Sequence, residues 1–451
     1  MKATRRSLLG AIAGAGSLGV TGLVSHLSQP AHAAGEDYRA LVVLFLMGGN
    51  DGHNLIVPTD GMYTDYQAAR TNLALSRASL ANLPGTAAGH SFGLHPALAP
   101  MVPMYGQGRL AFIANAGPLV VPTTALQAKT SAVDLPPFLL SHSDQIAIQQ
   151  GWTVTGDITG WAGRGLELLP STMRHPINAV TTSRERILVL GKHSRVSFMP
   201  SDGLRYWGVA DLARPDTTAT QTINRMAHWQ STNLYEAEYA RTFGGAVDDS
   251  TRFTQAPMQA RDPGADFGSG DLAVQLRALA KVMPVLKSQG YRRQVFLVSW
   301  GSFDHHVNQR GSDPKTQDAQ FSLMAKALAA FDEANKASGL DMNVLTLMMS
   351  DFGRTVRASS GGGSEHAWGN HWFAFGGPVS GGTVLGTFPS PVLGGPDDGD
   401  LANNGRHVPT TSTDQVGATV MQWMGLDPSA FHEVFPNLAN FKTKTIPLLR
   451  A

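Results

Sequence analysis

Three short apolar runs, each followed by an acidic residue, constrain the fold of this chain more than any other feature. The runs are Leu41–Leu46, Gln294–Trp300 and Asn343–Ser350. Asp51, Asp304 and Asp351 follow them in turn. Continuous apolar runs of this length are typical of parallel strands that are covered on both faces. In open α/β sheets, ligand sites lie beyond the carboxyl ends of such strands. We therefore expect one polar site at one edge of one sheet.

The rest of the chain alternates between strand-like and helix-like patterns. Further strands are expected at Arg109–Asn115 and Ile187–Leu190, and helices at His95–Tyr105, Thr222–Thr242, Asp271–Leu286, Gln320–Lys336 and Asp414–Met424. Helices that precede strands in this way are the signature of βαβ units. Residues 195–267 are richer in polar helical stretches and in Gly, Pro and Asp. We expect a single α/β domain over residues 35–451, with an insertion at about 195–267 that packs over the sheet.

The N-terminus resembles an export signal. Thr4-Arg5-Arg6-Ser7-Leu8-Leu9 precedes a Gly-, Ala- and Leu-rich segment, and Ala31-His32-Ala33 offers a small-residue cleavage site. A basic start, an apolar middle and such an exit, with paired arginines, are typical of a twin-arginine signal. Gly and Ser interrupt the apolar segment, which argues against a membrane anchor. We predict a signal peptide at residues 1–34, export by the twin-arginine (Tat) machinery, and a periplasmic or secreted mature protein.

Charge and cysteine content exclude several classes of function. Removal of the signal, with Lys2, Arg5 and Arg6, takes the formal charge from +1 to −2. A nearly neutral chain lacks the basic footprint of a nucleic-acid-binding protein. No other stretch approaches the length of a transmembrane helix, so we expect no stable membrane insertion. The chain has no cysteine, which excludes disulfides and thiolate ligands, so a metal must be held by Asp, Glu, His or other oxygen donors.

Carboxylate and imidazole donors gather after the three runs. The candidates are Asp51, Asp304, His306, Asp351, Glu365, His366 and His371. Such a set can coordinate Zn²⁺, Mn²⁺ or Mg²⁺, and two metals can clamp a displacement reaction. Plainer interpretations exist for single residues. Asp51 can be a turn former or helix N-cap, Asp351 can pair with Arg354, His371 can be a loop histidine, and one of His305 and His306 can be structural.

Six motifs together resemble the DUF1501 family, whose members are exported bacterial proteins that usually carry twin-arginine signals. They are LVVLFLMGGNDGHNLIVP, GLHPALAPMVPMYGQGRLAFIANAG, SHSDQ, SDFGRT, EHAWGNHWFAFGGPVSGG and RHVPTTSTDQVGATVMQWMGL. The resemblance covers nearly all of the mature chain. The family is similar to the alkaline phosphatase-like (sulfatase-like) superfamily, which implies a three-layer α/β sandwich with a mostly parallel central sheet. It also implies a metal site with Asp51 as the early ligand, Asp304 and His306 as one later pair, and Asp351 and His366 as the other.

The chain departs from the superfamily at three points of that site. Phe352 follows Asp351 where a histidine is common, Glu365 replaces an aspartate before His366, and the spacing from Asp304 to His306 is short. These differences remove one expected imidazole, which bears on whether a second metal fits. The resemblance therefore implies the fold directly, whereas activity depends on the individual residues of the site.

A hydroxyl nucleophile is the least defined part of the site. Ser141 stands at the start of a helix-like run, where a helix N-terminus helps to bind an anion and a metal activates a hydroxyl; the plainer interpretation is an N-cap. Ser143 is the second candidate, and Thr123-Thr124 the third. Arg354 is the candidate for bidentate binding of a phosphate or sulfate oxygen.

The reading that unites these observations is an exported, metal-dependent hydrolase of small-molecule or polymer-borne phosphate or sulfate esters. Two alternatives stay open. The first is a serine hydrolase with a Ser-His-Asp triad, but the chain lacks the G-x-S-x-G motif that forms the nucleophile turn. A non-catalytic exported binding or assembly module could retain the fold and the metal without turnover. The Cys/Ser-x-Pro-x-Arg signature of ordinary sulfatases is missing from the chain, which disfavours a formylglycine-dependent enzyme.

Overall fold

The structure is a computed structural model that describes residues 37–151, 158–199, 206–207, 210–211 and 214–450. The predicted export signal lies outside these residues. The strands are β1 Arg39–Leu46, β2 Ile56–Pro58, β3 Ala81–Asn82, β4 Phe92–Leu94, β5 Leu110–Gly117, β6 Ala179–Thr181, β7 Ser197–Phe198, β8 Tyr206–Trp207, β9 Ala210–Asp211, β10 Arg293–Trp300, β11 Val344–Ser350, β12 Arg354–Ala358, β13 Ser364–His366, β14 Asn370–Phe375, β15 Thr383–Leu385 and β16 Thr411–Ser412. The α-helices are α1 Met62–Arg70, α2 Val102–Gly106, α3 Ala125–Thr130, α4 His142–Gln149, α5 Trp161–Glu167, α6 Thr218–Ala227, α7 Leu234–Gln259, α8 Asp271–Ser288, α9 Gln317–Ala337, α10 Thr413–Met424 and α11 Phe431–Val434.

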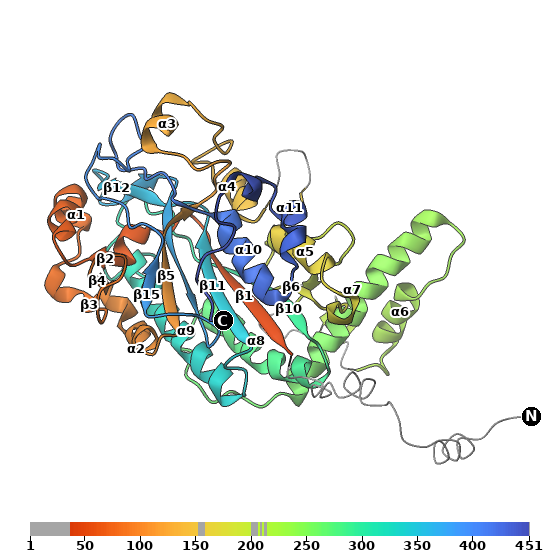
Figure 1. Cartoon of the computed structure of the whole chain (residues 1–451). Coiled ribbons are helices and arrows are strands. Elements are labelled where there is room, and N and C mark those ends of the chain that lie inside the picture. Colours follow the sequence, from red (N-terminus) through yellow and green to blue (C-terminus); the bar gives the residue numbers. More distant parts are fainter. Residues whose placement is uncertain (1–36, 152–157, 200–205, 208–209, 212–213, 451) are drawn as a thin grey trace, which may run out of the picture.

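One large β-sheet runs through the middle of the molecule (Figure 1). Its strand order is β15-β5-β14-β11-β1-β10-β6-β7, and β16 also pairs with β5. Only the pairings of β14 with its two neighbours, β11 and β5, are antiparallel; the other pairings described in this sheet are parallel. β1 lies between β10 and β11, so the three strands expected from the apolar runs are adjacent at the centre of the sheet.

Helices cover both faces of the sheet. On one face, α8 and α9 pack in a hydrophobic core with Val42 and Leu44 of β1. On the other face, α5, α10 and α11 pack in a second core with Leu41 and Val43. Alternate residues of β1 thus enter opposite cores, which explains why the strand is apolar from Ala40 to Leu46. The expected three-layer α/β class with a mostly parallel central sheet is confirmed.

Three expected elements differ from the structure. The helix expected at His95–Tyr105 is a 3₁₀ helix, Pro96–Met101, followed by the short α2. The strand expected at Ile187–Leu190 is wrong, because Ile187–Val189 form one 3₁₀ turn. Leu188 and Val189 are buried in the core beside α5, so burial alone accounts for this apolar run. The helix expected at Thr222–Thr242 is two helices, α6 and α7, separated by residues 228–233. Figure 1 shows that these two helices project away from the sheet.

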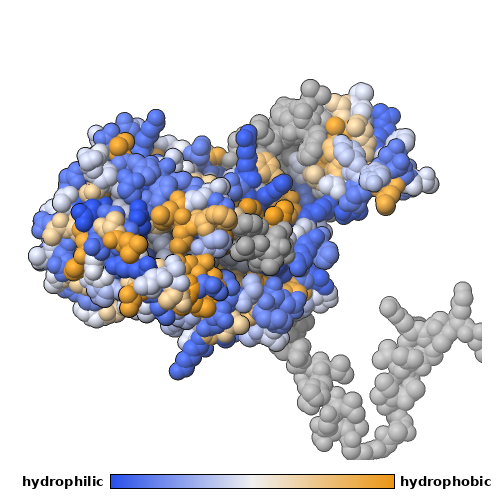
Figure 2. Space-filling model, turned by 90° about the horizontal axis from the view of Figure 1, so that it is seen from above, coloured by the Kyte–Doolittle hydropathy of each residue, from blue (hydrophilic) through white to orange (hydrophobic). Residues whose placement is uncertain are grey.

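The projecting α6 and α7 form a separate lobe when the molecule is seen from above (Figure 2). Apolar side chains are exposed there, among them Trp229, Leu234 and Tyr235. Across the described residues, no helix is both long enough and apolar enough to cross a membrane.

Candidate metal centre

The carboxyl ends of β1, β10 and β11 stop at the same level of the sheet. Leu46, the last residue of β1, pairs in register with Trp300 of β10 and with Ser350 of β11. The backbone N–H of Gly48 then donates to Asp351 Oδ2 at 3.0 Å. The polar segments that follow the three strands therefore meet at one edge, as the apolar runs led us to expect.

Three imidazoles surround the carboxylate of Asp304 at this edge. Its Oδ1 lies 3.0 Å from His306 Nε2 and 3.1 Å from His366 Nε2. Its Oδ2 lies 3.4 Å from His142 Nε2. The donor atoms of His142, Asp304 and His366 all lie within 4.8 Å of one another, a spacing at which they could hold a metal ion. The Asp304 side chain is 40% exposed, so the group opens to solvent.

The second ring nitrogen, Nδ1, of each imidazole is hydrogen-bonded to an oxygen atom. The acceptors are Glu365 Oε2 at 2.7 Å for His306, the Leu140 carbonyl at 2.8 Å for His366, and Asp351 Oδ2 at 2.8 Å for His142. A carbonyl or carboxylate oxygen only accepts hydrogen bonds, so each Nδ1 carries the hydrogen. In the neutral ring the lone pair is then on Nε2, which faces Asp304 in all three residues. Such oriented histidines are typical of metal sites.

The facing lone pairs need a cation between them. His306 Nε2 and His366 Nε2 lie only 3.0 Å apart, and both adjoin an oxygen that carries negative charge. A shared proton or a bound metal ion removes the repulsion. Ligands of a tetrahedral zinc ion at 2.0–2.1 Å stand about 3.3 Å apart, close to the spacings found here. The donor set therefore fits a divalent ion, and its imidazoles favour zinc over magnesium.

The electrostatics of the group follow from burial and from neighbouring charges. Burial alone raises the pKa of Asp304, but the hydrogen bond and charge of Arg354 outweigh it and hold that pKa well below its usual range. The hydrogen bond to Asp351 raises the pKa of His142. Burial lowers the pKa of His366, and the charge of Arg354 acts in the same direction. Asp304 is thus an anion that is paired with the cationic Arg354.

Arg354 connects the polar segments at this edge of the sheet through its hydrogen bonds. It begins β12 and lies directly opposite His366 of β13. Its buried guanidinium donates from Nε to the Gly49 carbonyl at 2.8 Å, from Nη1 to the Ser364 carbonyl at 2.9 Å, and from Nη2 to Gly48 and Asp304. The ion pair that it forms is with Asp304, whereas the sequence had suggested Asp351. These contacts engage most of its donors, so the expected anion contact would require rearrangement.

Asp51 belongs to a neighbouring, fully buried network. Its Oδ2 forms an ion pair with Arg70 and accepts from Gln309 Nε2 at 2.5 Å. Its Oδ1 caps a 3₁₀ turn by accepting from the backbone N–H of His53 at 3.0 Å. The arrangement matches the plainer interpretation of Asp51 as a helix cap, strengthened by an ion pair that the sequence did not reveal.

The candidate hydroxyls occupy local positions. Ser141 is the N-cap of α4, and its Oγ donates to Asp144. Ser143 is exposed. Thr124 caps α3 together with Gln127. The carbonyl of Leu140 and the ring of His142, on either side of Ser141 in the chain, both contact the Asp304 group.

His142 is the residue that sequence reasoning missed. The motif Ser141-His142-Ser143-Asp144 was interpreted for its hydroxyls, and the histidine between them was passed over. The signal was present in the sequence, because the motif precedes a helix and one imidazole expected after Asp351 was missing. In the structure, His142 packs on Phe352 with ring centroids 4.7 Å apart and lies between Asp304 and Asp351.

A second set of histidines is buried nearby. His305 is buried, whereas His306 reaches Asp304, and His305 Nε2 lies 2.7 Å from the Lys315 carbonyl. His371 and His407 each pack edge-on against His53, with centroids 5.5 and 5.1 Å away. Burial lowers the pKa of His371 to about 3 and that of His407 to about 4. These rings are therefore neutral at pH 7, and His371 contributes to the core, not to the Asp304 group.

A family model described as "Protein of unknown function (DUF1501)" matches residues 38–436. No match is found among curated proteins.

Several solved structures are similar over much of the chain. The lipoteichoic acid synthase LtaP of Listeria monocytogenes is 11% identical, with a TM-score of 0.30, and the match covers 87% of this chain and 74% of that one. The PsFucS1 sulfatase of Pseudoalteromonas sp. is 11% identical, with a TM-score of 0.31, and covers 78% and 65%. The periplasmic domain of EcEptC from Escherichia coli, in complex with Zn, is 10% identical, with a TM-score of 0.28, and covers 76% and 74%. Similarities this distant carry no information about activity.

Proposed function

The chain belongs to the DUF1501 family, and from this premise and the geometry of the Asp304 group we propose that it is an exported, metal-dependent hydrolase of phosphate or sulfate esters. The observation that carries the proposal is the convergence of His142, His306 and His366 on one carboxylate, each with its lone pair turned inward. In our proposal Asp304, His142 and His366 hold the ion, and His306 is a fourth donor.

Asp351 and Asp51 take supporting roles in this proposal. Asp351 Oδ2 orients His142 through a hydrogen bond of 2.8 Å and thereby sets which nitrogen faces the ion. Asp51 anchors the turn after β1 through Arg70. We keep Ser141 as the nucleophile, with Ser143 or water as alternatives, because Ser141 is held beside the group and Asp144 can accept its proton.

Asp304, His142 and His366 would hold a divalent ion, which would supply a lowered pKa for an adjacent hydroxyl or water and compensation of negative charge on the transferred group. The chain's own residues do the rest. Asp144 holds the Ser141 proton, Arg354 keeps Asp304 ionised, and the exposed face of Asp304 leaves room for an anionic ester. The substrate can be a small molecule or borne on a polymer. Near-neutral charge argues against nucleic acid.

Export rests on the sequence alone. The twin-arginine pattern at Thr4–Leu9 supports the Tat machinery as a partner and a periplasmic or secreted location. The machinery carries folded proteins, which suits a metal loaded before export. Fusion of residues 1–34 to a reporter that requires Tat export, with Arg5 and Arg6 both replaced by Lys as the control, tests this part separately.

A non-catalytic binding or assembly module is the second candidate. It is favoured by the contacts of the three polar residues on which catalysis would depend. Arg354 is engaged by backbone carbonyls, Asp51 by Arg70, and Ser141 by Asp144. Residues that are engaged in this way could support a site that binds metal without catalysing a reaction.

A turnover screen distinguishes the two candidates. Protein loaded with zinc or manganese is tested on aryl phosphate monoesters, phosphate diesters and sulfate esters. We expect hydrolysis by the wild type and by the control Asp65→Ala, an exposed aspartate on α1, and loss in Asp304→Ala and His142→Ala. Ser141→Ala against Ser143→Ala then assigns the nucleophile. If metal-loaded protein hydrolyses none of these esters, the proposal of a hydrolase is overturned and the non-catalytic binding module remains.

A further inference from the structure

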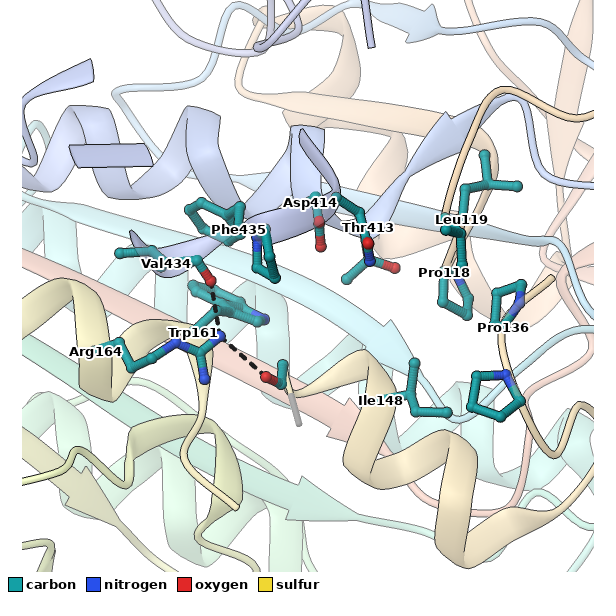
Figure 3. Close-up of a pocket in the computed structure, with 15 residues that line it drawn as sticks. Pro118, Leu119, Pro136, Ile148, Trp161, Arg164, Thr413, Asp414, Val434 and Phe435 are labelled. Atoms are coloured by element: carbon teal, nitrogen blue, oxygen red, sulfur yellow. Dashed lines mark hydrogen bonds between the residues drawn. The ribbon is translucent and has the colours of Figure 1, made fainter. Parts of the chain in front are cut away.

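A pocket of about 300 Å³ lies among α4, α5, α10, α11 and the segments at 118–120 and 136–137 (Figure 3). This volume is at the lower end of the range for small-molecule sites. The lining is mainly apolar, with Pro118, Leu119, Pro136, Ile148, Trp161 and Phe435 among its residues. A concave, mostly apolar surface with a few polar groups is the usual form of a ligand site.

Two charged side chains interrupt the apolar lining. Arg164 is buried and donates to the carbonyls of Thr159 at 2.6 Å, Gly151 at 3.0 Å and Val434 at 2.7 Å. Asp414 extends from the start of α10 into the pocket beside Thr413 (Figure 3). Its Oδ2 is buried and has no hydrogen-bond partner among the described residues. A buried carboxylate oxygen without a donor is unfavourable, and the pocket provides the space from which a donor can come.

The charges of the pocket indicate which donor. Arg164 and an ionised Asp414 balance each other, so a charged ligand would bring an uncompensated charge into an apolar site. A neutral hydroxyl satisfies Oδ2 without adding charge. We propose that this pocket binds a small neutral aromatic or alicyclic alcohol, whose ring packs on Trp161 and Ile148 and whose hydroxyl donates to Asp414.

The pocket is separate from the Asp304 group but shares α4 with it. His142 begins this helix and reaches the group, whereas Ile148 near its end lines the pocket. Thr413 Oγ1 donates to Gln149 Oε1 at 2.6 Å, and Gln149 Nε2 donates to the Asp351 carbonyl at 3.2 Å. The alcohol site does not depend on metal or on turnover, so its binding should persist in Asp304→Ala.

Isothermal titration calorimetry of the full-length protein with 2-naphthol tests the proposal. Burial raises the pKa of Asp414 to about 7, so the measurement is made at pH 8, where the carboxyl is ionised. The comparison ligands are 2-methoxynaphthalene, which cannot donate, the anion 2-naphthoate and the cation 2-naphthylmethylammonium. We expect saturable binding of 2-naphthol about tenfold tighter than that of the methoxy compound, the size of one hydrogen bond to a charged acceptor, and weaker binding of both ions.

Three variants make the test specific. Asp414→Ala should weaken 2-naphthol about tenfold and leave the methoxy compound unchanged. Ile148→Trp should fill the pocket and abolish binding of both. Leu126→Trp, at a residue of α3 that is 71% exposed, is the matched control and should bind like wild type. The proposal is overturned if wild type does not bind 2-naphthol saturably, if Ile148→Trp binds it equally well, or if either ion binds more tightly.

Discussion

Replacing Asp51 by asparagine tests whether this residue supports the fold or holds metal. The ion pair with Arg70 is fully buried, with side-chain exposures of 1% for Asp51 and 0% for Arg70. Asparagine has nearly the same shape but only one side-chain oxygen, which can stay on the His53 N–H. Its NH2 group then faces Gln309 and Arg70, which are donors themselves. The substitution therefore removes the counter-charge and the acceptor of both groups, and it leaves the guanidinium uncompensated inside the protein.

The magnitude follows from that burial. Removing one partner of a buried ion pair destabilises a protein by about 3–5 kcal/mol. Arg70 also donates to the carbonyls of Thr355 at 3.1 Å and Val356 at 3.4 Å, and these bonds survive in the variant. The carbonyl bonds reduce the loss and the opposed amide adds to it, so we expect about 3–5 kcal/mol.

Urea unfolding, monitored by tryptophan fluorescence, measures this loss as a lower urea concentration at the midpoint of unfolding. The double variant Asp51→Leu with Arg70→Met removes both charges, and we expect it to recover much of the loss, because apolar replacement of a whole buried pair is often close to neutral. Metal content should change little in Asp51→Asn. If the variant keeps its midpoint but loses its metal, Asp51 is a ligand, as the family resemblance implies, and our assignment is refuted.

Three further predictions concern the edge of the sheet. Asp351→Ala removes the hydrogen bond that most raises the pKa of His142, so this pKa should fall in metal-free protein; an unchanged NMR titration of the ring would contradict the assigned contact. Burial lowers the pKa of His371 from 6.5 to about 3, so between these values the unfolded chain binds a proton that the folded chain does not. The free energy of unfolding should thus decrease as pH falls through that window, and it should decrease less steeply in His371→Phe. Urea unfolding at several pH values measures this dependence, and equal slopes in wild type and variant would disprove the prediction. Gly48→Ala should lower Tm and weaken metal binding, because its φ is +100° and the new Cβ would lie 2.7 Å from the Asp304 nitrogen; the strained backbone alone costs about 1–2 kcal/mol, and a variant with wild-type Tm would show that the turn can relax.

The central sheet was predictable because burial on both faces leaves a direct mark on the sequence. The expected bounds of β1, β10 and β11 agree with the structure to within two residues, and the adjacency of these strands explains why the polar residues after them converge. The run at Ile187–Leu190 misled because a buried 3₁₀ turn is as apolar as a buried strand of the same length. Only the pairing of strands, which the sequence does not encode locally, separates the two.

The candidate site was predictable in part for a related reason. Asp304, His306 and His366 lie together because strand ends and the β12–β13 hairpin bring them together, and motif positions anticipate that. His142 and the Arg70–Asp51 pair depend on contacts between segments far apart in the chain. No spacing rule could have indicated that α4 turns its first residue toward β10, or that a helix outside the sheet would supply the counter-charge for Asp51.

Metal content of the purified full-length protein tests the central claim most directly. Protein prepared without chelators, and the same protein stripped and reloaded with zinc, is analysed for bound metal beside Asp304→Ala, His142→Ala and the surface control Asp65→Ala. We predict about one equivalent in wild type and control, with loss in both variants of the Asp304 group while their folds persist by circular dichroism. Well-folded wild type that takes up no zinc, manganese or magnesium would contradict the account, and the close imidazoles would then be held together by protons alone.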